Sequence, residues 1–194
     1  WAFFTYHDTN LSYYIKTAQF AEGIPDAERL ISELEEYTSK LEVTHITVLY
    51  LHIAKMFFGA ENYSKCLFWL NKILNEKHIL NSRPGIENNI RLMYLIVHFE
   101  KKNYNLLQSL AKSTHHYFSL KRILYEFEKV MINFFSKKFH AMSSDESVKA
   151  FKKLKHEMEI IITSKKGTMP FEEFDYASWI ESKIEKRPFA EIVR

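Results

Sequence analysis

Histidine is the residue type that first suggests chemistry in this sequence, because its nine histidines could supply metal ligands or general bases. A zinc-protease helix needs two histidines four positions apart, with a glutamate directly after the first. His156 and Glu157 begin such a pattern, but position 160 holds Ile160. His115 and His116 are adjacent, so on a helix their rings point about 100° apart and cannot share a metal ion. The histidine spacing therefore predicts no metal site.

Nucleophiles and phosphate-binding loops are also missing from the sequence. Cys66 is the only cysteine, which excludes an intrachain disulfide, and we expect it to be a buried structural thiol. The four glycines form none of the motifs that hold a nucleotide or position a serine nucleophile. Adjacent carboxylates such as Glu35-Glu36 and Glu172-Glu173 are typical of solvated helix faces. We predict that the protein is not an enzyme and binds no cofactor.

Helices would have to position these side chains. Apolar residues recur at intervals of three and four residues almost throughout, and no alternating run typical of a strand occurs. The pattern predicts an all-α fold of about nine helices. Gly23 and Pro25 are expected to end the first helix and to open the second. The first helix is expected to include 11–21. The next are expected at about 26–40, 43–58, 63–75, 87–101, 104–117, 120–140 and 144–163, with a last one from Pro170 and one further turn in the tail.

One turn is written twice in the sequence. Asn62-Tyr63 recurs as Asn103-Tyr104, 41 residues later. Two antiparallel helices joined by a tight turn bury their apolar faces by stacking on the next pair. Residues 47–74 fit the tetratricopeptide pattern without a gap, with Tyr50, Ile53, Ala54, Phe57, Tyr63, Cys66, Leu70 and Ile73 at its positions. This segment resembles a tetratricopeptide repeat, and the second copy resembles it less closely.

The resemblance implies antiparallel helix pairs, about four of them, stacked as a right-handed tetratricopeptide-like α-solenoid. We expect a single helical-repeat domain over residues 1–194, with a C-terminal capping helix in 170–194. The order of elements from Gly85 to the C-terminus also resembles the C-terminal half of uncharacterised bacterial helical-repeat proteins. Those proteins are longer, and this chain begins with Trp1, so we expect a fragment of a longer bacterial protein.

Tetratricopeptide proteins commonly bind other proteins, so the resemblance implies a non-catalytic protein–protein interaction scaffold. Members that hold C-terminal carboxylates use Lys, Asn and Arg on the first helix of a repeat. Of the corresponding positions here, Val48, Leu51, His52 and Lys55, only Lys55 could serve. We therefore favour an apolar groove for a helix or an extended peptide, on the face formed by 43–58 and 87–101. The candidate groove residues are Leu51, Lys55, Phe58 and Trp69.

Charge leaves an alternative open. Between residues 112 and 166, 12 Lys and Arg stand against six Asp and Glu. The candidate basic surface is Lys149, Lys152, Lys153 and Lys155. It could bind nucleic acid or an acidic partner, although we favour a solvated outer face, because the lysines are not interleaved with a nucleic-acid motif. A purely structural domain of the longer parent is a third possibility. No apolar run is long enough to cross a bilayer, and we predict a cytoplasmic protein without a membrane partner.

Overall fold

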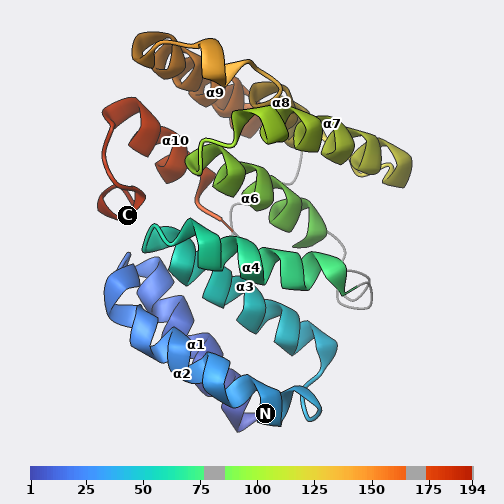
Figure 1. Ribbon diagram of the computed structural model, residues 1–194, viewed down its shortest axis with the longest axis vertical. Coiled ribbons are helices and arrows are strands. Elements are labelled where there is room, and N and C mark those ends of the chain that lie inside the picture. Colours follow the sequence, from blue (N-terminus) through green and yellow to red (C-terminus); the bar gives the residue numbers. More distant parts are fainter. Residues whose placement is uncertain (77–85, 165–173, 194) are drawn as a thin grey trace. The chain divides into compact units, whose positions relative to one another are not determined.

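The fold consists of helices alone. The computed structural model describes residues 1–76, 86–164 and 174–193. Within these ranges it contains nine α-helices and two short 3₁₀ helices, with no strand, which confirms the all-α prediction. The right-handed solenoid stays a prediction. The elements are α1 (Ala2–Lys16), α2 (Phe20–Thr38), α3 (Val43–Gly59), α4 (Tyr63–Asn75), α6 (Ile86–Glu100), α7 (Tyr104–Lys121), α8 (Glu126–Phe135), η1 (Phe139–Ala141), α9 (Ser144–Thr163), α10 (Tyr176–Glu185) and η2 (Phe189–Glu191) (Figure 1).

The chain divides into two compact units. The first holds residues 1–90 together with the C-terminal residues from Phe189 onward, and the second holds Arg91–Pro188. The boundary between Ile90 and Arg91 falls inside α6. The tail from Phe189 therefore packs with residues that lie far from it in the sequence.

In the first unit, α3 packs against α1, α2 and α4. A helix contacted from several sides must be apolar around most of its circumference. The α3 sequence meets this requirement, and Leu49, Ile53 and Phe57 are almost fully buried. Figure 1 shows α1 lying beside α2 and α3 beside α4.

In the second unit, α8 packs on α7 and α9, and α10 packs on α9. Its core is a cluster of rings whose contacting pairs have centroids 4.7 to 6.5 Å apart: Phe99, Phe134, Phe135, Phe139, Phe151 and Trp179. The N-cap predicted for α9 is confirmed. The Ser143 hydroxyl accepts from the Glu146 backbone N–H at 3.2 Å, and the Ser143 N–H donates to the Glu146 carboxylate at 2.8 Å.

The repeated turn has one geometry in both copies. Glu61 and Lys102 have φ angles of 56° and 58°, and each ends a helix in the left-handed conformation. The following N–H reaches back five residues, from Asn62 to the Phe57 carbonyl at 2.8 Å and from Asn103 to the His98 carbonyl at 3.0 Å. This is the Schellman arrangement, which satisfies the last carbonyls of a helix.

The predicted boundary between the first two helices is wrong. The same left-handed turn falls at Ala18 (φ 56°), where the Gln19 N–H donates to the Tyr14 carbonyl at 2.9 Å. Gly23 and Pro25 lie inside α2. A Cβ atom on Gly23 would lie 2.7 Å from Cγ of Tyr14, so this glycine permits close helix packing and does not end a helix.

The single helix predicted over 120–140 is also wrong. Arg122 adopts the left-handed conformation (φ 57°), and the Ile123 N–H donates to the Phe118 carbonyl at 3.0 Å. This turn ends α7, and α8 begins at Glu126 with two acidic side chains in its first turn, where the helix dipole favours them.

Near the C-terminus, the helix end predicted at Gly167 and the helix start predicted at Pro170 lie outside the described residues. α10 covers Tyr176–Glu185, and η2 supplies the further turn that was expected in the tail. The ring of Phe189, in η2, lies 5.8 Å from that of Phe20 and 5.3 Å from that of Phe58.

Candidate functional site

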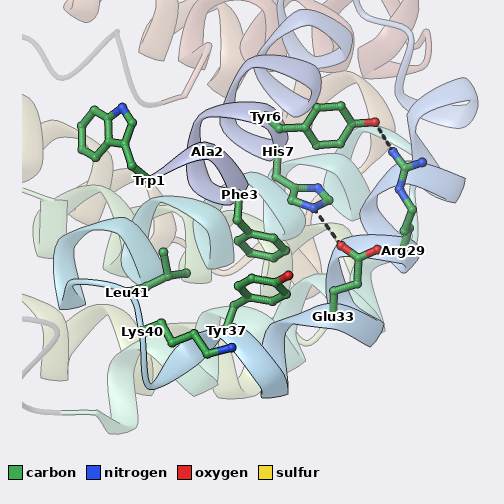
Figure 2. Close-up of a pocket in the computed structure, with 10 residues that line it drawn as sticks. All are labelled: Trp1, Ala2, Phe3, Tyr6, His7, Arg29, Glu33, Tyr37, Lys40 and Leu41. Carbon is green, nitrogen blue, oxygen red and sulfur yellow. Dashed lines mark hydrogen bonds and ion pairs between the residues drawn. The ribbon is translucent and has the colours of Figure 1, made fainter.

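A pocket of about 560 Å³ lies in the first unit between α1 and α2, at the end of this pair away from its turn. We call it the aromatic pocket, and Figure 2 shows its lining. Residues from the start of α1, from α2 and from the segment after α2 line it: Trp1, Ala2, Phe3, Tyr6, His7, Arg29, Glu33, Tyr37, Lys40 and Leu41.

The apolar wall of the pocket is a stacked pair of rings. Phe3 and Tyr37 lie face to face, with centroids 4.0 Å apart and planes 5° from parallel (Figure 2). Antiparallel pairing of α1 with α2 places them opposite each other. Trp1 is 83% exposed, and its ring meets His45 edge-on at 5.3 Å. Trp1 and Leu41 thus add apolar surface at the mouth of the pocket.

A histidine–carboxylate pair lies beside these rings in the lining of the pocket. His7 is 2% exposed, and its Nε2 lies 3.1 Å from Oε2 of Glu33 (Figure 2). An ionised carboxylate accepts only, so the proton of the neutral imidazole sits on Nε2. Nδ1 is then bare, and it is buried without a hydrogen-bond partner among the described residues. Neither ring nitrogen is available to take a proton from a molecule in the pocket.

The cationic side chains of the pocket also have partners. Nη2 of Arg29 donates to the Tyr6 hydroxyl at 2.6 Å and to the Asp26 carboxylate at 2.5 Å. Nζ of Lys40 lies 4.9 Å from the centre of the Tyr37 ring and 3.4 Å from the Glu36 carboxylate. The pocket therefore offers a ligand apolar contact, and the charged side chains around it are already paired with other protein groups.

The four residues predicted to line a groove are buried. Leu51 is 2% exposed, Lys55 8%, Phe58 1% and Trp69 5%. Phe58 packs on Tyr63 and Phe189, and Trp69 packs on Tyr50. They pack inside the protein and do not line the aromatic pocket, so their role in binding a partner stays a prediction.

The four lysines of the predicted basic surface all lie exposed on α9. Two of them face carboxylates. Nζ of Lys153 lies 3.7 Å from Glu157 on the same helix, and Nζ of Lys155 lies 2.6 Å from Glu181 on α10. Lys149 and Lys152 are also exposed, and no ion pair of theirs is found among the described residues.

The remaining candidates for chemistry lie apart from one another. Cys66 is fully buried, and burial raises the pKa of its thiol. His115 and His116 are exposed on α7. Across the described ranges, no three His, Cys, Asp or Glu side chains are grouped as metal ligands. Nor does any helix in those ranges combine the length and the apolar character needed to cross a bilayer.

Sequence reasoning missed the aromatic pocket because it assigned Leu11–Ala21 to the first helix and gave no element to the residues before Leu11. The signal was nevertheless present. Phe3, His7, Leu11 and Tyr14 recur at helical spacing, and so do Asp26, Leu30, Glu33 and Tyr37. Two such series on an antiparallel pair must meet in opposite order.

Comparison with protein-family models, with curated proteins and with solved structures found no match for this chain.

Proposed function

We propose that this chain is a non-catalytic protein-interaction scaffold of tetratricopeptide type, and that its aromatic pocket receives a segment of a partner protein. The observation that carries the proposal is the lining of the pocket: stacked and exposed rings form the wall and the mouth, and the charged groups are already paired. Large apolar side chains that insert into such pockets supply most of the affinity at protein interfaces. The expected occupant is a peptide segment with an aromatic or large aliphatic anchor.

Binding is favoured over catalysis at this site for a physical reason. A general base must present an accepting atom to the reacting group. Nε2 of His7 is hydrogen-bonded to the Glu33 carboxylate, and Nδ1 is shielded from solvent. The Arg29 guanidinium is held by Asp26 and Tyr6, so it offers little to a developing negative charge.

The test is selection of random peptides displayed on phage against the full chain. We expect enriched peptides that share a large apolar residue. Their affinity should fall about tenfold or more when Trp1→Ala and Leu41→Ala are combined, because this change removes apolar contact at the mouth. The matched control is Phe68→Ala, since Phe68 is 61% exposed but lies on α4, outside the pocket.

Two results would contradict the proposal. One is that the enriched peptides bind the double variant as tightly as the unchanged chain. The other is that Phe68→Ala weakens them to the same extent, which would mean that any exposed ring attracts them.

Nucleic-acid or acidic-partner binding through residues 112–166 remains the second candidate. The exposure of Lys149 and Lys152 on one helix favours it. The pairing of Lys153 with Glu157 and of Lys155 with Glu181 weakens it, because a paired lysine releases fewer counterions when it meets a phosphate.

A further inference from the structure

A second cavity, of about 550 Å³, lies within residues 91–188. It is formed where the ends of α6 and α10 meet the start of α7, η1 and the start of α9. We call it the lysine cavity, because Lys102, Lys183 and Lys186 line it together with a single carboxylate, that of Glu100.

The floor of the lysine cavity is aromatic. The Phe99 ring lies 4.9 Å from that of Phe139 and 5.4 Å from that of Phe151. These three rings are 7%, 5% and 1% exposed, so they belong to the core and hold a fixed shape. Tyr104 of the repeated turn lies beside them, 5.7 Å from Phe99, and is only partly buried. A ligand would find an apolar floor that does not have to be assembled on binding.

The rim is held together by Glu100. Its carboxylate, 9% exposed, accepts from Nε1 of Trp179 at 2.6 Å and from Nζ of Lys183 at 2.7 Å. These bonds join the end of α6 to α10. Because Lys102 lies in the turn that follows α6 and Lys186 directly follows α10, the same bonds hold both lysines at one mouth.

Lys102 and Lys186 are exposed, and neither forms an ion pair within the part of the chain that the structure describes. Glu100 is already satisfied by Lys183 and Trp179, so it does not neutralise them. The start of α9 contributes little, because the capping box between Ser143 and Glu146 already satisfies backbone N–H groups there. The mouth therefore presents two unpaired positive charges above an apolar floor.

We propose that the lysine cavity binds an acidic segment of a partner protein. An apolar side chain of that segment contacts the floor formed by Phe99, Phe139 and Phe151, and flanking carboxylates meet Lys102 and Lys186. Charge complementarity argues for this occupant. Nucleic acid fits less well, because the rings of the floor are too deeply buried to stack on successive bases. This site is separate from the aromatic pocket and does not depend on it.

The probe is the peptide acetyl-Glu-Asp-Phe-Asp-Glu-amide, fluorescently labelled and titrated against the full chain at low ionic strength. Its partner probe replaces the acidic residues by Gln and Asn. We expect the acidic peptide to bind at least tenfold more tightly than the neutral one. Combining Lys102→Gln with Lys186→Gln should remove most of this difference.

The matched control combines Lys112→Gln with Lys152→Gln, which removes the same charge from exposed positions of the same unit outside the cavity. It should leave binding within about twofold. A further variant, Val148→Trp, places a bulky ring in the lining and should block the peptide, with circular dichroism to confirm that the helices remain.

The proposal is overturned if the acidic peptide does not bind at millimolar concentration, or if both lysine pairs matter equally. It is also overturned if an oligonucleotide of equal charge binds more tightly through Lys102 and Lys186. Because none of these variants touches Trp1 or Leu41, failure here and failure of the aromatic-pocket proposal give separate results.

Discussion

Among single residues, His52 has the most consequential environment. It lies on α3 with its side chain 13% exposed, and burial together with Lys55 and Lys16 lowers its pKa from 6.5 to about 3. Asp8 of α1 lies 3.5 Å from Nδ1, at the limit of hydrogen bonding, and burial raises the pKa of its own carboxyl. His52 is thus neutral in the folded protein at pH values where an exposed histidine is protonated.

The sign of the resulting pH dependence follows directly. Below pH 6.5 the unfolded chain takes up a proton at His52 and the folded chain does not, so stability falls as the pH falls from about 6.5 towards 3. Between pH 7 and pH 4.5 this residue should cost about 2.5 kcal/mol of unfolding free energy.

Denaturant unfolding of the His52→Gln variant at both pH values tests this, because glutamine does not titrate. We expect the variant to lose less stability on acidification than the unchanged chain. His116→Gln, at an exposed position, should lose as much stability on acidification as the unchanged chain does. Equal losses in all three proteins would contradict the assignment.

At the scale of elements, the turns that follow α1, α3, α6, α7 and α10 share one feature. Within residues 1–76, 86–164 and 174–193, five residues other than glycine have φ angles of 56° to 58°: Ala18, Glu61, Lys102, Arg122 and Lys186. The left-handed conformation costs an L-residue about 1–2 kcal/mol, and glycine avoids this cost. The fold therefore keeps avoidable strain at its turns, including both copies of the repeated one.

Glu61→Gly should stabilise the protein. Glycine removes the strain but adds about 0.5–1 kcal/mol of chain entropy to the unfolded state, so the net gain is about 0.5–1 kcal/mol. The change is read as a higher denaturant midpoint. Ala60→Gly, one residue earlier at φ −82°, relieves no strain and should destabilise instead. A loss of stability in both variants would show that the Glu61 side chain matters more than its backbone.

At the scale of the whole molecule, the C-terminal tail belongs to the first unit. The Phe189 side chain is 6% exposed and packs on Phe20 at the start of α2 and on Phe58 near the end of α3. Gly59 allows this region to pack closely, since a Cβ there would collide with the Phe20 ring. Residues 130 or more positions apart in the sequence thus share one cluster of rings.

Phe189→Ala should cost about 3 kcal/mol or more, because it leaves a cavity between two helices. Hydrogen exchange should rise in the first turn of α2 and the last turn of α3. Val193→Ala, at a half-buried position of the same tail, is the control and should have a smaller effect. Unchanged exchange in α2 and α3 would refute this role of the tail.

Local pattern was enough to identify much of this protein. Helical spacing predicted the all-α fold, the bounds of α3 and α4 to within a residue, and the serine cap of α9. These features depend on neighbours three or four positions away, so the sequence alone determines them. The buried character of Cys66 follows from the same spacing.

The tertiary structure decided what depends on distant neighbours. Gly23 and Pro25 are residue types typical of a helix boundary. Gly23 nevertheless lies inside the continuous helix α2, where it faces Tyr14 and Met56. Lys102 and Lys186 have no local relation, and Glu100, through α10, brings them to one cavity. Residue types and their periodicity specify helices, whereas packing partners set which glycine is a spacer and which lysines form a site. This sequence therefore determined the class of fold by itself, and only the folded chain located the aromatic pocket and the lysine cavity.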